Sequence, residues 1–331
     1  MKASVVIPTL NHPEAIKRTL NALNTQTVRA DQYEVIVVDD GSAEEHRSAI
    51  ERFVALLTGI DATFIYQGVN SGKAKAVNAG LRRAKYELVL LTDDDCVPAE
   101  DWIGSHIRIH ERIRGSASVV GHITLPFEWI NASNFCRYIN SRYIGNRFNR
   151  SGNGKPLVVP PKFFSGGNVS VPLEILIRVG MFNESISRGQ DVELGFRLWE
   201  AGIPLIYCPN ASIVHYAETA RDIDRWISVL IKAFYYSVPQ FEKLHPGASS
   251  RFGHWFLARA QYGQESIHRI VIKYLVRSIL HHEIAELLKT ILKRMDRNRF
   301  FFWPAAFKYV LASACLEAVK EHEQLSKGTI T

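Results

Sequence analysis

The chain has 331 residues, of which 47% are hydrophobic and 22% are charged, close to the average of globular proteins. This length is enough for one large domain or two smaller ones with a full core. The formal net charge is +7, and the part from Ala217 onward holds 17 Lys and Arg against 11 Asp and Glu. This basic excess suggests a surface that faces anionic lipid, a phosphorylated carrier or another protein, although a solvated helical face explains it equally well.

Cysteine usage and apolar runs exclude several classes of protein. The four cysteines lie far apart and show no CxxC spacing, which argues against a zinc site or a disulfide framework and fits a reducing compartment. The apolar run near the N-terminus is too short for a signal peptide, and no stretch of about 18 uncharged apolar residues offers a spanning helix. We therefore expect a cytoplasmic protein, and no nucleic-acid partner.

The first part of the chain alternates predicted strands with predicted helices. Short apolar runs predict strands at 4–8, 33–40, 62–67 and 86–95. Apolar residues at one-face spacing predict helices around 16–23 and over 43–57 and 72–84. Such alternation indicates βαβ units, and therefore an α/β fold with a parallel sheet.

Polar residues gather where three of these strands end. They are residues 8–11, 39–42 and 93–95. Ligands of open α/β sheets lie beyond the carboxyl ends of the strands, so these groups are expected to form one binding site. A purely structural domain has no need for acids there.

Beyond Trp102 the pattern weakens. We predict one strand over 118–124, followed over 125–165 by loops and short helices that are shaped for a second ligand. The later segments are a strand interrupted by glycines, a helix, and two strands separated by a break at Pro209-Asn210; they span 163–171, 190–202 and 203–216. From Glu218 the chain is mostly helical, so the expected domains are 1–217 and 218–331.

Asp93, Asp94 and Asp95 place three like charges at the end of a predicted buried strand. They repel each other unless something positive lies among them. Clustered carboxylates in such a place usually bind a hard cation such as Mg²⁺ or Mn²⁺, which also bridges to phosphates. The alternative is a set of turn or N-cap residues before a helix that starts near Pro98. One aspartate would suffice for that, so three favour the cation.

Four further residues are candidates for the site, and three of them also have a structural interpretation. Asp40 precedes a Gly-Ser turn, where it can accept hydrogen bonds from a nucleobase or ribose. Asp191 begins a helix, as an N-cap or as a positioned acid. His215 ends a strand, as a metal ligand or as a core histidine. The segment around Lys73 fails the P-loop pattern, because only three residues separate Gly68 from Gly72 and Ala74 follows the lysine. Lys73 is therefore interpreted either as a charge near a diphosphate or base, or as an exposed helix lysine.

The order of these segments resembles that of the inverting nucleotide-sugar glycosyltransferases of family 2, which have the GT-A fold. The resemblance covers residues 4 to about 216, and the matching pieces are SVVIPTLN, VIVVDDGS, GVNSGKAKAVNAGL, LLTDDDCVP, GGNVSV, GQDVELGFRL and ASIVHY. It implies a Rossmann-like, mostly parallel central sheet with flanking helices, followed here by a C-terminal helical region.

The resemblance also implies roles for single residues. Asp191 matches the general base, and Asp95 and His215 match ligands of Mn²⁺ or Mg²⁺. Donor binding falls to residues along the strand ends: Pro8, Thr9, Asp40, Lys73, Asp93 and Asp94. The sequence departs from the family at Gln190, where Glu is usual, which puts in doubt a second acidic role such as orienting the acceptor.

The implied reaction is inverting transfer from a nucleoside-diphosphate sugar to a hydroxyl, with UDP the family's commonest nucleotide. The acceptor is a glycan, a lipid-linked molecule or a small molecule, in glycan, polysaccharide or glycoconjugate assembly. A hydroxyl is a poor nucleophile, so a carboxylate must take its proton, while a divalent cation stabilises the leaving diphosphate. The alternatives are a nucleotide-sugar-binding scaffold with a degenerate site, and a sugar-1-phosphate nucleotidyltransferase, whose N-terminal glycine-rich loop is missing.

The C-terminal helices combine basic and aromatic residues. Arg269, Lys273 and Arg277 recur at i, i+4 spacing on an otherwise apolar helix, and basic residues precede a Phe/Trp cluster within 293–310. This pattern is typical of a helix that lies on the anionic inner face of a membrane. Two alternatives remain: a helical subdomain packed on the catalytic core with its basic stripe in water, and a homodimer interface.

Overall fold

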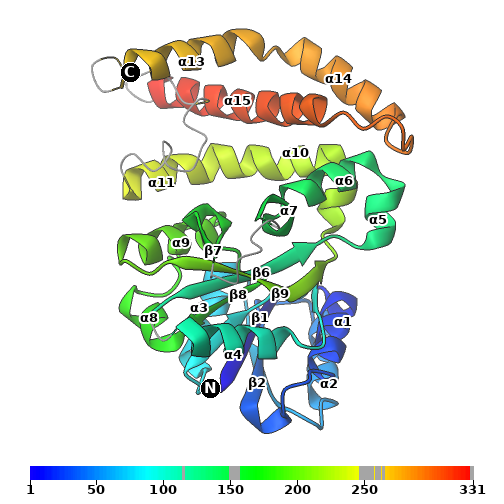
Figure 1. The fold of residues 1–331 in the computed structure, drawn as a ribbon, viewed down its shortest axis with the longest axis vertical. Helices are drawn as coiled ribbons and strands as arrows, with labels where there is room; N and C mark the ends of the chain where they lie inside the picture. The colour runs from blue at the N-terminus through cyan, green and yellow to red at the C-terminus, as the bar shows by residue number, and fades with distance from the viewer. Residues whose placement is uncertain (114–115, 149–156, 246–256, 258–261, 263–264, 329–331) are drawn as a thin grey trace. The chain divides into compact units, whose positions relative to one another are not determined.

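The computed structural model describes residues 1–113, 116–148, 157–245, 257, 262 and 265–328 (Figure 1). The chain divides into two compact units, one of residues 1–126 with 141–217 and one of residues 127–140 with 218–331. Of the predicted second-ligand segment 125–165, residues 149–156 lie outside the described part. We describe each unit by itself.

The first four strands of the sheet unit are parallel. They are β1 (Ala3–Thr9), β2 (Tyr33–Asp39), β3 (Asp61–Tyr66) and β4 (Leu88–Leu91), in the order β3-β2-β1-β4. The connecting helices are α1 (Pro13–Leu23), α2 (Glu44–Ala55) and α3 (Lys73–Arg83). The predicted α/β fold with βαβ units is therefore confirmed, and the carboxyl ends of these strands meet at one edge.

The other half of the sheet is mixed. Its strands are β5 (Cys96–Pro98), β6 (Ser118–Thr124), β7 (Leu157–Val159), β8 (Val169–Pro172) and β9 (Leu205–His215). β8 is antiparallel to both β4 and β6, β9 is parallel to β6, and β5 and β7 are antiparallel to β9. Within the described residues, nine strands thus form one sheet.

Helices cover both faces of this sheet. The remaining helices of the unit are α4 (Trp102–Ile113), α7 (Ile144–Phe148), α8 (Leu173–Arg178) and α9 (Gln190–Glu200). Successive side chains of a strand point to opposite faces. Val5 accordingly packs in a cluster with α1, α2 and α4, while Val6 packs in another with α3, α8 and α9. Both faces are buried, which explains why the strands read as continuous apolar runs.

Three predicted strands have different bounds in the structure. The strand predicted over 86–95 ends at Leu91, and the three aspartates form a turn before β5, because adjacent carboxylates do not fit a buried ladder. The strand predicted over 163–171 begins only at Val169. The two strands predicted over 203–216 are one strand, β9, whose pairing with β6 jumps from Cys208 to Ser212. Pro209 and Asn210 lie in this irregularity, where proline is tolerated.

The second unit is helical. Its helices are α5 (Phe127–Ala132), α6 (Asn134–Arg142, its last two residues counted with the sheet unit), α10 (Ile223–Lys232), α11 (Val238–Leu244), α13 (Ile267–Ile279), α14 (His282–Arg294) and α15 (Pro304–Gly328). Residues 127–140 belong to this unit because α6 packs on α15 and on the segment that follows α14. The ring of Tyr138 stacks on Phe307 with centroids 5.1 Å apart, and Asp296 Oδ1 accepts a 2.8 Å hydrogen bond from the Phe135 N–H.

Two of the three basic residues predicted to form a stripe on α13 are paired with glutamates of the same unit. Lys273 is buried and its Nζ lies 2.6 Å from Glu265 Oε1, while Arg277 pairs with Glu323 at 3.0 Å. A lysine is buried only when it is paired, so these charges serve the interior of the unit. An exposed basic stripe is therefore wrong for Lys273, whereas membrane contact of the C-terminal helices stays a prediction. Among the described helices, none is long and apolar enough to cross a bilayer.

Candidate active site

The three aspartates of the turn between β4 and β5 point to different partners. Asp93 pairs with Lys73 from the start of α3, Asp94 lies beside Thr9 and His12, and Asp95 lies beside His215 at the end of β9. These contacts with Lys73, His12 and His215 reduce the repulsion expected of adjacent carboxylates.

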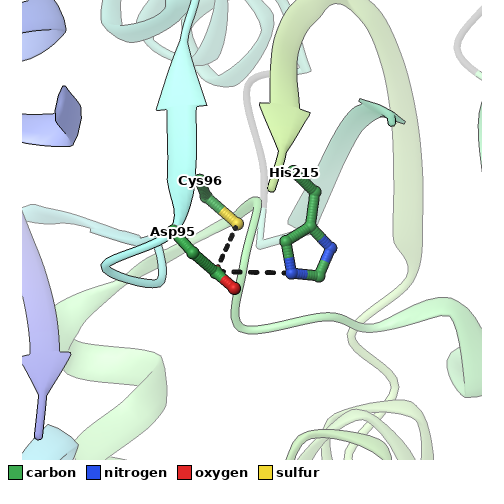
Figure 2. Close-up of side chains that lie close together, drawn as sticks. All are labelled: Asp95, Cys96 and His215. Carbon is green, nitrogen blue, oxygen red and sulfur yellow. Dashed lines mark hydrogen bonds and ion pairs between the residues drawn. The ribbon is translucent and has the colours of Figure 1, made fainter. Parts of the chain in front are cut away.

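Asp95 and His215 approach each other from adjacent strands. Figure 2 shows the carboxylate of Asp95 directed at the imidazole, with the thiol of Cys96 beside it; Asp95 Oδ1 lies 3.3 Å from His215 Nε2. Cys96 is the Cα partner of His215 in the β5–β9 ladder, and Tyr143 Oη lies 3.2 Å from His215 Nδ1. Burial lowers the pKa of His215, but the hydrogen bond and charge of Asp95 outweigh it, so the pKa lies above 6.5.

This pair fits a divalent cation. Ligand atoms of Asp95, Cys96 and His215 all lie within 4.8 Å of one another. Carboxylate oxygen and imidazole nitrogen together suit Mn²⁺. Burial raises the pKa of the Cys96 thiol well above its usual value, and this side chain packs in the core, so we count two donors rather than three.

Lys73 lies between two carboxylates. Its Nζ is 2.6 Å from Asp93 Oδ1 and 4.0 Å from Asp191 Oδ2. Burial lowers the pKa of Lys73, yet the two carboxylates outweigh burial and the pKa is raised, so the ammonium group stays charged. Lys73 thus joins the acid at the end of β4 to the acid at the start of α9.

Asp191 lies in the first turn of α9 but does not cap it. The N-cap is Gly189, and Asp191 Oδ2 instead accepts a 3.0 Å hydrogen bond from the Gly166 N–H. Its Oδ1 is buried and has no hydrogen-bond partner among the described residues. Burial raises the pKa of this carboxyl, while Lys73 and the Gly166 N–H act against that shift. A held carboxylate with one free oxygen is suited to accept a proton from a ligand.

Asp94 is directed into the protein. Thr9 Oγ1 donates a 2.7 Å hydrogen bond to Asp94 Oδ2, and His12 Nδ1 lies 3.4 Å from the same oxygen. Burial raises the pKa of Asp94, although Thr9 and His12 act in the opposite direction. The hydrogen bond to Asp94 in turn raises the pKa of His12. Thr9 and Asp94, two predicted donor-binding residues, therefore bind each other here.

Asp40 holds the loop that delivers Lys73. Asp40 Oδ1 accepts a 2.9 Å hydrogen bond from the Ser71 N–H, and Oδ2 accepts one of 2.8 Å from the Gly72 N–H. The neighbouring Gly41 has φ +89°, and a Cβ there would lie 2.4 Å from the Asn70 backbone nitrogen. Only glycine allows this approach of the two loops. Pro8, in β1, precedes Thr9 at the same edge.

Gly166 and Gly167 lie close to Asp191 and Asp93. From the sequence, these glycines indicated only that the backbone approaches a ligand or another strand. A Cβ on Gly166 would lie 3.0 Å from Asp191 Oδ1, and one on Gly167 would lie 3.4 Å from Asp93 Oδ2. Asn168 secures this loop from the core: its Oδ1 accepts a 2.8 Å hydrogen bond from Trp102 Nε1, and its Nδ2 donates to the carbonyl oxygens of two other strands.

His12 and Tyr143 were missed altogether. The sequence LNHPEA around His12 contains no motif that points to a role for this histidine, and Tyr143 lies in a stretch without periodicity. Only their distances to Asp94 and His215 identify them.

The comparisons with known proteins agree with this arrangement. Residues 4–166 match the model of glycosyl transferase family 2. The chain is 29% identical over 230 residues to a chondroitin synthase from Escherichia coli, covering 60% of this chain and 32% of that protein. It is 28% identical over 228 residues to a hyaluronan synthase from Pasteurella multocida, covering 60% of this chain and 23% of that protein. The chain thus spans about a third or less of the length of these curated relatives.

Solved structures share the fold. A mannosyltransferase from Pyrobaculum calidifontis, in complex with GDP-Man and Mn²⁺, has a TM-score of 0.60 at 20% identity, over 98% of this chain and 88% of that one. GalNAc-T7, with UDP, GalNAc and Mn²⁺, has a TM-score of 0.52 at 16% identity, over 83% of this chain and 54% of that one. Through its residues 4–166 the chain belongs to glycosyl transferase family 2, and its sheet unit has the GT-A fold.

Proposed function

We propose that this protein transfers a glycosyl group from a nucleoside-diphosphate sugar to an acceptor hydroxyl, with inversion at the anomeric carbon. The observation that carries the proposal is the buried Oδ1 of Asp191, which has no hydrogen-bond partner among the described residues, while Oδ2 accepts from the Gly166 N–H and lies 4.0 Å from Lys73 Nζ. A binding scaffold with a degenerate site does not require a carboxylate that is positioned to accept a proton.

In the proposed reaction, Asp191 accepts the proton of the acceptor hydroxyl while that oxygen attacks the anomeric carbon. The bond from carbon to the nucleoside diphosphate breaks, and the diphosphate leaves with the electron pair on the opposite face. Asp95 and His215 would hold a Mn²⁺ or Mg²⁺ ion, which supplies electrostatic stabilisation of the leaving diphosphate. Lys73 adds a fixed positive charge nearby and lowers the pKa of Asp191, against the effect of burial.

Donor binding is assigned to the strand ends. Pro8, Thr9 and Asp40 would contact the nucleobase and ribose, while Asp93, Asp94 and Lys73 lie toward the diphosphate and sugar. In the described structure Asp40 and Asp94 already have protein partners, so we assign them to shaping the site as well as to contact. The solved neighbours hold GDP-Man in one case and UDP in another, and UDP is the first nucleotide to test.

We base the proposed class of acceptor on the names of the relatives. Two of them are named as synthases of chondroitin and hyaluronan, which suggests a glycan acceptor and polysaccharide assembly. A lipid-linked or small-molecule acceptor, a homodimer, and peripheral contact of the C-terminal helices with the inner face of a membrane belong to the same proposal.

The test is donor turnover with a matched pair of variants. The protein is incubated with UDP-, GDP- and dTDP-sugars plus Mn²⁺, and release of nucleoside diphosphate is measured with and without glycan acceptors. Asp191→Asn keeps the shape of the side chain but removes the base, so release should fall at least about a hundredfold while donor affinity stays within about twofold. Asp31→Asn, on the surface, serves as control. Binding without release in the parent protein would establish the scaffold instead.

A further inference from the structure

Helix α13 presents its apolar side outward. Ile267, Val271, Tyr274, Leu275 and Ile279 recur at spacings of three and four residues and are between 49% and 80% exposed. The opposite side of the helix holds Lys273 and Arg277, which are paired with glutamates inside the unit. This arrangement inverts that of an ordinary surface helix, whose charged side faces water.

The neighbouring helix continues this surface. Ile284, Leu287 and Ile291 recur along α14 and are exposed, while its Ala285 and Leu292 are buried. Figure 1 shows α13 and α14 lying along the same side of α15. Because both helices bury the side turned to α15, their exposed apolar sides face away from it. We call these eight exposed residues of α13 and α14 the outer apolar face.

The end of α14 and the loop that follows it add two aromatic residues and positive charge. Phe300 is fully exposed and Trp303 is partly exposed. Arg294, Arg297 and Arg299 are exposed and form no ion pair with any described residue. The acids nearby include Asp296, which accepts a hydrogen bond from the Phe135 N–H, Glu286, which is paired with Lys289, and the exposed Glu283.

We propose that the outer apolar face and this arginine loop dock on an anionic lipid bilayer. Exposed apolar patches of this extent mark interaction sites. Unpaired arginines beside interfacial aromatics match the negative potential of such a bilayer, whereas a second copy of this chain would bring its own arginines to the contact. The proposal names the surface for the membrane contact included in the proposed function, but it requires no glycosyl transfer.

The test is sedimentation of the full chain with vesicles of phosphatidylcholine alone or mixed with phosphatidylglycerol. We expect binding only to the mixed vesicles, weakened about fivefold by Arg297→Ala and again by Arg299→Ala. Leu275→Glu should weaken it at least about tenfold. Leu56→Glu and Arg83→Ala are the matched controls in the sheet unit, and both should bind as the parent does.

Two further measurements keep the result interpretable. Circular dichroism melts show whether each variant folds, and Tyr274→Ser replaces Leu275→Glu if the latter does not. Sedimentation velocity without lipid gives the oligomeric state. The proposal is overturned if no variant changes vesicle binding, if the parent does not bind, or if Leu275→Glu instead dissolves a dimer. Donor turnover is measured separately in solution, so its failure leaves the vesicle result intact.

Discussion

Asp95 and His215 face each other between the start of β5 and the end of β9, with Asp95 Oδ1 3.3 Å from His215 Nε2. The raised pKa of His215 means that this imidazole holds a proton at pH values where a free histidine has lost it. A metal ligand must be neutral imidazole, so a cation entering here displaces that proton.

The affinity for Mn²⁺ should therefore rise with pH. Below the raised pKa of His215 each bound ion releases one proton, so affinity increases about tenfold per pH unit and levels off above that pKa. Electron paramagnetic resonance of free Mn²⁺, from pH 6 to 9, measures this. His215→Gln removes the competing proton and should flatten the curve, whereas Asp95→Asn should weaken binding at every pH. An unchanged slope in His215→Gln would exclude His215 as a ligand.

Lys73→Met should move the acidic limb of the pH–rate profile upward. The charge of Lys73 lowers the pKa of Asp191, so its removal leaves burial and Asp93 to raise this pKa further. The base is active only when ionised, so the rate falls near neutral pH and recovers at higher pH. Lys73→Arg should keep the parent profile, and Lys75→Met, on the exposed side of α3, is the control. A uniform loss of rate at all pH values contradicts the assigned role.

Gly166→Ala should slow transfer with little effect on donor binding. The added Cβ would lie 3.0 Å from Asp191 Oδ1, tighter than ordinary contacts, so the carboxylate must shift. A displacement of a reacting group by about 1 Å can cost about a hundredfold in rate. Steady-state kinetics measures kcat and the KM for the donor, with Gly59→Ala as the control, since a Cβ there meets its nearest atom at 3.5 Å. A parent-like kcat would show that Asp191 tolerates the shift.

Asn168→Ala should destabilise the sheet unit. The side chain is fully buried, and its loss leaves Trp102 Nε1 and two carbonyl oxygens without their partner. Each buried group left unpaired costs about 1–3 kcal/mol, so we expect a loss of about 3 kcal/mol or more. Urea denaturation measures it, and Asn24→Ala, at an exposed helix end, should change stability by less than about 1 kcal/mol.

Local patterns made the N-terminal half of the fold predictable. The apolar runs around Val5 and Val35 and the spacing of Ile16, Leu20 and Leu23 depend only on neighbours in sequence. The pairing of β5 with β9, which brings His215 to Asp95, depends on residues far apart in the chain, and no periodicity encodes it.

The site was predictable as a set of residues but not as a set of partners. Asp93, Asp95 and Asp191 follow from motif order, whereas the contacts of Lys73 with two of them and the role of Gly166 require coordinates. On α13, basic and apolar residues occupy opposite sides, and spacing alone does not say which side is buried. Lys273 lies on the buried side because Glu265 is there to pair with it.

Because residues 127–140 belong to the helical unit, they limit where the chain can be truncated. Phe135 and Tyr138 pack on Phe307, so a truncation after residue 217 removes their cover and leaves two aromatic rings in water. Such a fragment should aggregate on expression even though its sheet is whole. A shortened protein for crystallisation has to keep the part of α15 around Phe307, or replace Phe135 and Tyr138 with polar side chains.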